Sequence, residues 1–260
     1  MKRIVREHQF KFTASVILLP LVFVFAMWLV FWVEMKFNVN FHHYGIYPRE
    51  WFGLKGVLLS PFLHSDFQHI TNNSLALLVL LAMLQYFYKA QTVAVLFLGI
   101  LFSGFGTWLL GRPSYHIGAS GLIYVLVSFI FFKGIFTKYY RLMAVSFVVV
   151  LLYGGMVWYM FPEVDQSVSW EGHLSGFLTG LSMALLIKTP QFGKPMHYEW
   201  EHPDFNPEKD KFMRNFDENG NFNPPPKIVL AEEEDSLKNY FSSSIKVIYE
   251  FLGFKKETKR

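Results

Sequence analysis

The sequence predicts an all-α integral membrane protein with six transmembrane helices and a polar C-terminal tail. Of its 260 residues, 52% are hydrophobic and 17% are charged, whereas about a quarter of the residues in an average soluble domain are charged. The apolar residues gather in uncharged runs close to the roughly 20 residues that a helix needs to cross hydrocarbon. These runs lack the alternation of barrel strands, and lipid tolerates no unpaired backbone amides, so we expect helices.

The first apolar run covers residues 14–33. Four basic residues precede it, at positions 2, 3, 6 and 11, which is the order seen in a secretory signal peptide. The run is longer than the apolar region of a signal peptide and lacks a small-residue cleavage site. We therefore expect it to remain in the protein as the first span.

Five further uncharged runs predict the second to sixth spans; they cover residues 70–88, 92–110, 117–132, 142–161 and 172–187. The segment between the first two runs, residues 39–63, is rich in aromatic residues, Gly and Pro, and is expected to be a structured element at the membrane interface.

Basic residues favour one orientation of these spans. They are more frequent at the N-terminus, after the fourth run (Lys133, Lys138 and Arg141) and after the sixth run than in the other loops. This bias favours cytoplasmic N- and C-termini in a multi-pass protein of a bacterial inner or plasma membrane.

The composition changes after the sixth run, so residues 1–190 are expected to form the membrane domain and residues 191–260 a polar cytoplasmic tail. The first half of the tail is expected to be extended or disordered, because it is polar and contains three consecutive prolines at 224–226. Apolar residues recur at helical intervals in residues 236–254. They are consistent either with a short amphipathic helix or with a solubilising tail.

Charge and cysteine content narrow the chemistry. The formal net charge of +4 is modest, and the basic residues lie beside apolar runs, so nucleic-acid binding is not expected. The absence of cysteine excludes disulfides, thiol nucleophiles and cysteine-based zinc sites. Catalysis would have to use oxygen or nitrogen groups.

Polar residues occur near the starts of the second, fourth and sixth predicted helices, which enter the membrane from the same side. Such residues are costly in lipid and normally face a bundle interior, a cavity or one another. We therefore expect a water-filled pocket at this depth. The residues are His64, Asp66, His69, Asn72 and Asn73 on the second helix, His116 and Ser120 on the fourth, and His173 and Ser175 on the sixth.

These residue types suit acyl transfer. Ser120 would attack a carbonyl carbon, and His173 would take its proton. His69 and Asn73, four residues apart on one helix face, would donate to the oxyanion together with the backbone N–H of Ser120.

Four glycines accompany these residues. Gly118 and Gly121 flank Ser120 and would allow a tight start to the helix and close approach of a substrate backbone. Gly176 and Gly180 lie on one stripe of the sixth helix and would bring its backbone close to a neighbour. Small residues in membrane helices also serve packing alone, so the glycines by themselves do not predict catalysis.

The polar residues have structural interpretations as well. Asn72 and Asn73 would suit the N-terminal cap of the second helix. His42 and His43 are expected to be solvated or interfacial rather than metal ligands. A catalytic site is favoured only because Ser, two His and Asn recur at one depth.

Three motifs on alternate helices resemble those of the rhomboid family of intramembrane serine proteases; they are HSDFQHITNN at 64–73, GASG at 118–121 and GHLSGFLTG at 172–180. The similarity covers roughly residues 10–190 and implies a six-helix rhomboid bundle. It implies that Ser120 and His173 form a dyad without a carboxylate. It also implies that His69 and Asn73 help to form the oxyanion hole and that Tyr124 packs against the catalytic histidine.

Two positions depart from the family pattern. The first loop lacks the common Trp-Arg pair and has Leu54, Lys55 and Gly56 nearby. Gln85 stands where many bacterial members have a glutamate. These differences concern loop packing and internal hydrogen bonding, not the dyad.

The sequence therefore predicts an active intramembrane serine endopeptidase whose partners are transmembrane protein substrates and the lipid bilayer, with no metal or cofactor. The resemblance to the rhomboid family also implies that such substrates are cut near the outer face at small residues. The loop at residues 163–171, with the fifth helix, is the expected movable gate.

Three alternatives remain open: a catalytically inactive relative that binds or escorts membrane clients, a small transporter that uses the polar pocket, and a lipase or esterase. The first two predict a pocket without a nucleophile. The third also uses a reactive serine, but such hydrolases place it on a strand-turn-helix in a soluble sheet.

Overall fold

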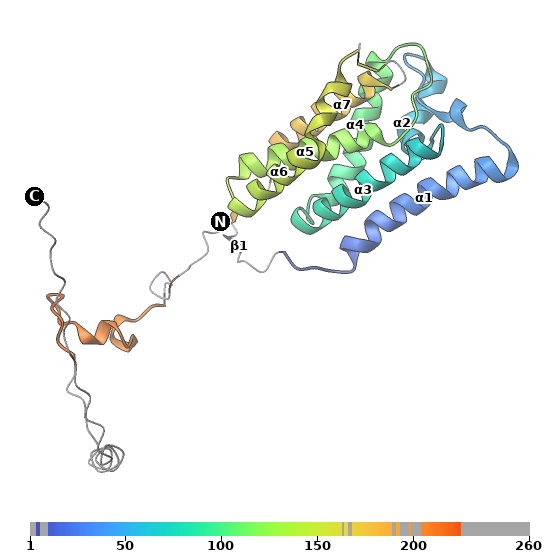
Figure 1. The fold of residues 1–260 in the computed structure, drawn as a ribbon. Coiled ribbons are helices and arrows are strands. Elements are labelled where there is room, and N and C mark those ends of the chain that lie inside the picture. The colour runs from blue at the N-terminus through green and yellow to red at the C-terminus, as the bar shows by residue number, and fades with distance from the viewer. Residues whose placement is uncertain are drawn as a thin grey trace, which may run out of the picture. The chain divides into compact units, whose positions relative to one another are not determined.

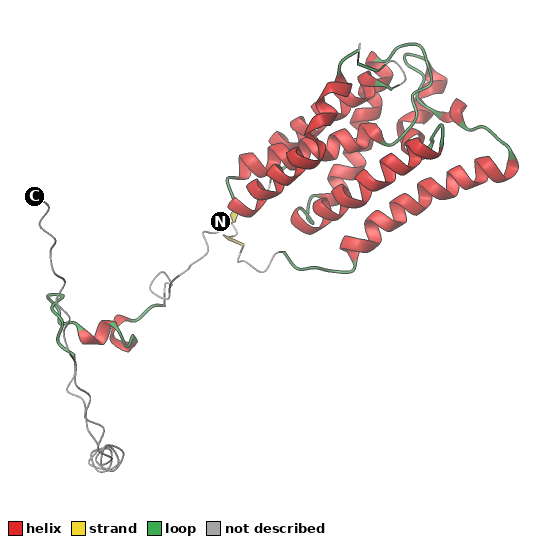
Figure 2. Ribbon diagram, viewed as in Figure 1, coloured by secondary structure: helices red, strands yellow, loops and turns green. Residues whose placement is uncertain are grey.

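The computed structural model describes residues 4–5, 10–162, 164–165, 168–188, 191–192, 198 and 204–224. The chain divides into two units, Met1–Pro195 and Met196–Arg260. The first unit is a helical bundle (Figure 1), and helices are its main secondary structure (Figure 2). Its α-helices are α1 (Ser15–Phe37), α2 (Gly56–Leu59), α3 (Phe67–Phe87), α4 (Thr92–Leu110), α5 (Ser120–Thr137), α6 (Tyr140–Tyr153) and α7 (Trp170–Leu186).

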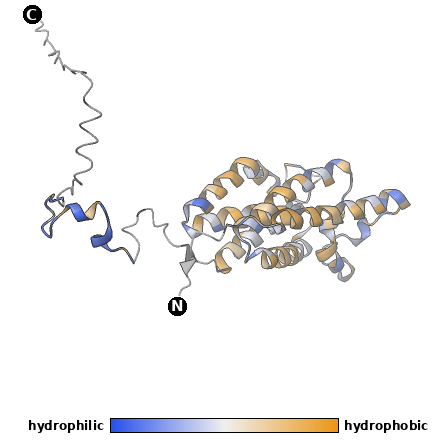
Figure 3. Ribbon diagram, turned by 90° about the horizontal axis from the view of Figure 1, so that it is seen from below, coloured by the Kyte–Doolittle hydropathy of each residue, from blue (hydrophilic) through white to orange (hydrophobic). Residues whose placement is uncertain are grey.

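Five of the described helices are long and apolar enough to cross a membrane: α1, α3, α4, α5, and α6 together with the 3-10 helix η5 (Gly154–Met160) that continues it. Figure 3 shows the predominantly hydrophobic character of the bundle helices. The sixth predicted run forms α7, which has 17 residues and is shorter than these five. The prediction of an all-helical, multi-pass membrane protein is confirmed, apart from a two-residue parallel pairing of β1 (Ile4–Val5) with β2 (Gln191–Phe192).

Helix α5 is the centre of the bundle and packs against α7, α6, α4 and α3. Most of its apolar side chains are buried, although Ile135 and Phe136 near its C-terminal end are exposed. In contrast, α1 packs against α3 at one edge (Figure 1) and exposes many apolar side chains. Exposed apolar side chains on a membrane helix match the hydrocarbon of lipid. The fully buried core residues of α3 and α5 include Leu77, Leu80, Leu81, Leu84, Leu126, Phe129 and Ile130.

Two glycines of α7 set the distance between α5 and α7. A Cβ atom at Gly176 would lie 2.2 Å from the carbonyl oxygen of Gly121, and one at Gly180 would lie 2.3 Å from that of Val125. No side chain fits there, so the two backbones are in direct contact. This contact brings the start of α5 next to the start of α7.

The segment at residues 39–63 is structured, as expected, and forms η2 (His42–Tyr44), η3 (Trp51–Lys55), α2 and η4 (Ser60–Phe62). It is fastened to the end of α4 by Arg49, which has a left-handed backbone with φ of 61°. The Arg49 backbone N–H donates to the Trp108 carbonyl, and its guanidinium donates to the carbonyl of Gly111 at 2.8 Å. Arg49 therefore satisfies free carbonyls at the C-terminus of α4.

Lys133 differs from its expected place in a loop. Helix α5 continues to Thr137, and Lys133 is buried within it. Its ammonium group donates to the carbonyl oxygen of Ala184 at 2.9 Å and to that of Ile187. The free carbonyls at the end of α7 thus provide the partners that make a buried lysine tolerable.

Gln85, one of the departures from the family pattern, has a partner inside the bundle. Its amide nitrogen donates to the hydroxyl oxygen of Ser15 at 2.9 Å and joins α3 to α1. Trp28 makes a second link of this kind, because its indole N–H donates to Ser74 at 2.9 Å.

The described part of the second unit, residues 204–224, contains η7 (Pro207–Lys209), η8 (Met213–Asn215) and a bridge between Phe216 and Phe222. The expectation that the first half of the tail is extended or disordered stays a prediction, and residues 204–224 have this local order. This order arises from hydrogen bonds in which Asp217 Oδ1 accepts from the backbone N–H groups of Asn219 and Asn221, both at turn positions that favour Asx geometry. The expected amphipathic helix at 236–254 lies outside the described residues.

Candidate active site

The polar starts of α3, α5 and α7 meet at one cavity of about 1150 Å³. Its wall includes Ser120 and Tyr124 from α5, His173 from α7, and His69 and Asn73 from α3. The rest of the wall includes the loop between α4 and α5, the 3-10 helix η5, and Asp165, Val168 and Ser169 of the segment before α7. One cavity therefore contains the residues that the helix directions predicted at one depth.

Ser120 begins α5, three residues later than the predicted start of the fourth helix. Gly118 delays the start because its φ is +105°, a conformation outside the helical region that glycine adopts readily. A Cβ atom there would lie 2.6 Å from Nε2 of His69. Gly118 therefore permits both the turn before Ser120 and the close approach of α3.

The first backbone N–H groups of α5 are available as donors. The first four N–H groups of any helix lack intrahelical partners, and α5 has no side-chain cap. The dipole of the helix also places a partial positive charge at this end. The backbone N–H of Ser120 is therefore suited to stabilise the oxyanion of a carbonyl group that the Ser120 side chain attacks.

His173 lies in the first turn of α7, whose N-terminal cap is Ser169. Its Nδ1 atom is 2.9 Å from the carbonyl oxygen of Tyr159 in η5. A carbonyl can only accept, so Nδ1 carries the proton of the neutral ring and Nε2 has a free lone pair. His173 is thus held in the tautomer that a general base needs.

The ring of Tyr124 stacks on the ring of His173, with centroids 4.4 Å apart and an interplanar angle of 18°. The Tyr124 hydroxyl donates to the carbonyl oxygen of Met156 at 2.6 Å. Both members of the stacked pair therefore hydrogen-bond to the backbone of η5. This segment fixes the orientation of the histidine.

The Ser120 hydroxyl and His173 line the same cavity, but no hydrogen bond joins them in the described structure. The ends of the helices that carry them are nevertheless in contact, since a Cβ atom at Gly121 would lie 3.6 Å from the carbonyl oxygen of Gly172. Catalytic hydrogen bonds are often long without substrate and tighten when it binds.

Asn73 is oriented by a buried histidine. Its amide nitrogen lies 3.0 Å from Nε2 of His64 and donates to it, because an amide nitrogen cannot accept. The same nitrogen carries a second N–H, and it would lie 3.5 Å from a Cβ atom at Gly118. Asn73 is therefore a preformed donor next to the turn before Ser120.

His69 is arranged differently. The Ser65 hydroxyl donates to Asp66 at 2.6 Å, so its oxygen can only accept from Nδ1 of His69, 3.1 Å away. Nε2 of the neutral ring, which faces Gly118, then carries no proton. His69 would donate to an oxyanion only as the other tautomer or as the doubly protonated ring.

Asp66, and not the two asparagines, caps α3. Its carboxylate accepts from the backbone N–H of His69 at 2.8 Å, which is the usual N-cap geometry. The pKa of Asp66 is lowered, first by the hydrogen bond from Ser65 and then by that from His69. The interpretation of Asn72 or Asn73 as this cap was therefore wrong, and Asn73 lines the cavity instead.

Burial determines the charge state of the two histidines that flank the cavity outside the spans. It lowers the pKa of His64 from 6.5 to about 3, and the neighbouring His69 adds to the effect. Burial also lowers the pKa of His116. Both rings therefore remain neutral at physiological pH.

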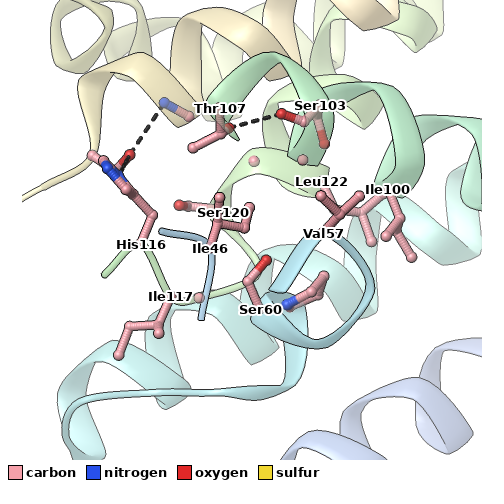
Figure 4. Close-up of a pocket in the computed structure, with 16 residues that line it drawn as sticks. Ile46, Val57, Ser60, Ile100, Ser103, Thr107, His116, Ile117, Ser120 and Leu122 are labelled. Atoms are coloured by element: carbon pink, nitrogen blue, oxygen red, sulfur yellow. Dashed lines mark hydrogen bonds between the residues drawn. The ribbon is translucent and has the colours of Figure 1, made fainter. Parts of the chain in front are cut away.

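A second, smaller cavity of about 30 Å³ lies behind Ser120 and is shown in Figure 4. Ser60, Ser103 and Thr107 line it, and this volume accommodates one or two water molecules. Ser103 and Thr107 were not among the residues predicted from the sequence, although two hydroxyl residues four positions apart in an apolar span are a usable signal.

Comparisons with known proteins give a consistent result. Residues 49–190 match the family model for the rhomboid domain. The chain is 36% identical over 184 residues to "Uncharacterized protein Rv1337" of Mycobacterium tuberculosis, an alignment that covers 66% of this chain and 75% of that protein. It is 29% identical over 179 residues to "Uncharacterized protein ML1171" of Mycobacterium leprae, with coverage of 66% and 71%.

Proposed function

Because the chain belongs to the rhomboid family, we propose that it is an active intramembrane serine endopeptidase, with Ser120 as nucleophile and His173 as general base. The observation that carries the proposal is the hydrogen bond from His173 Nδ1 to the Tyr159 carbonyl, in a cavity shared with Ser120. This bond leaves Nε2 free to accept a proton. An inactive relative has no need of a histidine held in this tautomer.

In the proposed reaction, the Ser120 oxygen attacks the carbonyl carbon of the scissile peptide while its proton passes to Nε2 of His173. The resulting oxyanion accepts from the side chain of Asn73, from the Ser120 backbone N–H and, when its Nε2 is protonated, from His69. The protonated His173 then donates to the departing amine. Water then attacks the acyl carbon while its proton passes to Nε2 of His173, and the protonated His173 returns this proton to the Ser120 oxygen as the ester bond breaks and the carboxylic acid product leaves.

The dyad has no carboxylate partner in this scheme, and the backbone of η5 takes that role. The Tyr159 carbonyl orients the ring and stabilises its protonated form, because the Nδ1–H bond strengthens when the ring becomes positive. Stacking of Tyr124 holds the ring plane. Gly118, Gly176 and Gly180 support the site by allowing the close approach of the three helices, whereas a Cβ atom at Gly121 would make only an ordinary contact, 3.6 Å from the Gly172 carbonyl oxygen.

We propose that α7 is the sixth transmembrane span. We also propose that the protein lies in a bacterial inner or plasma membrane with both termini in the cytoplasm. At 1.5 Å per residue a helix of this length extends about 25 Å, less than the hydrocarbon thickness of about 30 Å. A short helix packed between α4 and α5 would begin below the membrane surface, at the floor of a water-filled pocket. The substrates would be transmembrane segments of other membrane proteins, and residues 191–260 would form a cytoplasmic tail.

The test is a comparison of membrane-protein fragments from cells that produce the wild-type chain, Ser120→Ala or His173→Ala at equal levels in the membrane. Ser128→Ala is the matched control, because it removes a hydroxyl from the same helix, one that donates to the Phe177 carbonyl. We expect fragments with the wild-type chain and the control, and their loss in the other two variants. The same fragments in all four strains would refute the proposal and favour the inactive, client-binding alternative.

A further inference from the structure

An ion pair joins the loop ahead of Ser120 to the helix that carries His173. The backbone N–H of Arg112 donates to Oε1 of Glu171 at 3.1 Å, and Nε of Arg112 lies 3.8 Å from the same oxygen. The Arg112 guanidinium also donates to the carbonyl oxygen of Val168. The Glu171 side chain is only 3% exposed, whereas that of Arg112 is 37% exposed.

A second link joins the same two segments through His116 and Ser169. Nε2 of His116 faces the Arg112 carbonyl at 3.0 Å and therefore carries the proton. Nδ1 then accepts from the Ser169 hydroxyl at 2.6 Å. The Ser169 oxygen in turn accepts from the backbone N–H of Gly172 at 3.2 Å, so the N-terminal cap of α7 is part of this link.

The loop is anchored on its other side as well. His116 exchanges two backbone hydrogen bonds with Ile46, at 2.8 and 3.0 Å, and the Gly118 N–H donates to the Ser60 carbonyl at 2.9 Å. Arg112 and His116 are thus held eight and four positions before Ser120. Ser169 and Glu171 are held four and two positions before His173.

Stability alone does not explain a carboxylate at position 171. Burial of a carboxylate is costly, and a buried ion pair is often no more stable than apolar residues of the same volume. Moreover, Oε2 of Glu171 is buried and has no hydrogen-bond partner among the described residues. Such a costly group indicates a geometric requirement at this position.

We propose that Arg112 and Glu171, together with His116 and Ser169, form a positioning clasp that sets the distance between Ser120 and His173. This inference rests on the proposed function. None of the four residues is assigned to the reacting atoms, so they act through the segments that they join. Proton transfer requires the donor and acceptor to approach within about 3 Å, and a displacement of about 1 Å can reduce a rate roughly 100-fold.

The test uses the full-length chain in liposomes and compares wild type, Arg112→Gln, Glu171→Gln and the double variant. The rate of reaction of Ser120 with a fluorophosphonate probe measures the activation of the nucleophile, and cleavage of a transmembrane substrate gives kcat and KM. We expect each single variant to lower the labelling rate and kcat about 10- to 100-fold, with KM nearly unchanged. The labelling rate and kcat of the double variant are expected to fall no further than those of the slower single variant, because each substitution already breaks the same interaction.

Folding is measured in parallel by thermal unfolding. Arg112→Gln leaves the Glu171 charge buried without its partner and is expected to be the least stable variant. The double variant is neutral and should regain stability while its labelling rate stays low. This separation of stability from rate is the result that a purely structural role would not give.

Arg49→Gln is the matched control. Like Arg112, Arg49 donates from its guanidinium to backbone carbonyl groups, in its case those of Leu109 and Gly111 at the end of α4. Arg49 joins this end to the first loop and not to α7. Clasp variants that react as fast as Arg49→Gln, at equal folded fractions, would overturn the clasp and leave the proposed function intact. A folded wild-type chain that is not labelled at Ser120 would overturn both.

Discussion

Nδ1 of His173 lies 2.9 Å from the carbonyl oxygen of Tyr159, in the 3-10 helix that continues α6. The tautomer and orientation of the His173 ring therefore depend on η5, which lies outside the three helices α3, α5 and α7 that carry the polar groups of the site. The loop at 163–171, of which residues 164, 165 and 168–171 are described, follows this segment. The gate that we predicted there therefore stays a prediction, but the residues just before it contact the histidine directly.

The first prediction concerns Tyr124, which supports His173 by stacking and η5 by its hydroxyl. Tyr124→Phe removes only the bond to the Met156 carbonyl and should reduce the labelling rate of Ser120 about fivefold, since one such bond contributes about 1 kcal/mol. Tyr124→Ala removes the stacked ring too and should reduce the rate further. Equal rates for both variants would show that stacking does not orient the histidine.

The second prediction separates the two side chains expected to donate to the oxyanion. Asn73 presents an N–H in every state, whereas Nε2 of neutral His69 carries no proton while Ser65 donates to Asp66. Asn73→Ala should therefore lower kcat about 100-fold or more, the usual loss of one oxyanion donor, and His69→Ala should lower it less at pH 8. Steady-state cleavage of a transmembrane substrate measures both. A larger loss for His69→Ala would contradict the proton positions inferred from Ser65.

The third prediction tests the contact between α5 and α7. Gly176→Ala places a Cβ atom 2.2 Å from the Gly121 carbonyl oxygen, so the helices must separate, and the free energy of unfolding should fall by about 1–3 kcal/mol. Gly155→Ala is the control, because a Cβ atom there has no neighbour within 4 Å. Thermal unfolding in detergent compares the two. Equal unfolding temperatures would mean that the backbones are not in contact.

The fourth prediction is a pH dependence of stability. Because burial lowers the pKa of His64 from 6.5 to about 3, the folded state binds fewer protons than the unfolded state between these values. Stability is therefore complete above pH 6.5 and falls as the pH decreases. From pH 7 to pH 5 this histidine should reduce the free energy of unfolding by about 2 kcal/mol.

His64→Gln keeps an acceptor for Asn73 and should flatten that dependence, as measured by unfolding at several pH values. The exposed His43 supplies the control, since His43→Gln also removes an imidazole but not a buried one. If wild type and His64→Gln lose stability in parallel below pH 6.5, the ring of His64 is not buried as described.

The sequence predicted the helices well and their starts less well. Uncharged runs locate hydrocarbon-length helices because lipid selects for length and apolarity. Helix starts depend on caps and backbone angles, which hydropathy does not contain. Helix α5 therefore begins at Ser120 and not at the predicted position 117, because Gly118 has a non-helical backbone. Helix α3 begins at Phe67 and not at position 70, because Asp66 is its N-cap.

The residues of the candidate site were predictable where the direction of the helices determines their position. Alternate helices begin on one side of a membrane, and this rule brought together Ser120, His173, His69 and Asn73 at one cavity. The carbonyl groups of Tyr159 and Met156 were not predictable, because a backbone acceptor leaves no mark in residue type. The pairing of Arg112 with Glu171, 59 positions away, was not predictable either, since pairing between distant loops follows only from the fold.

The most direct test of the central claim is the reaction of the folded, membrane-embedded chain with a fluorophosphonate, followed by peptide mass spectrometry. The account predicts a covalent adduct on Ser120, and a reaction that slows strongly in His173→Ala, because Nε2 of that ring accepts the serine proton. A folded wild-type chain that forms no adduct at Ser120 would contradict this claim. An adduct that forms as fast in His173→Ala as in the wild type would contradict it as well.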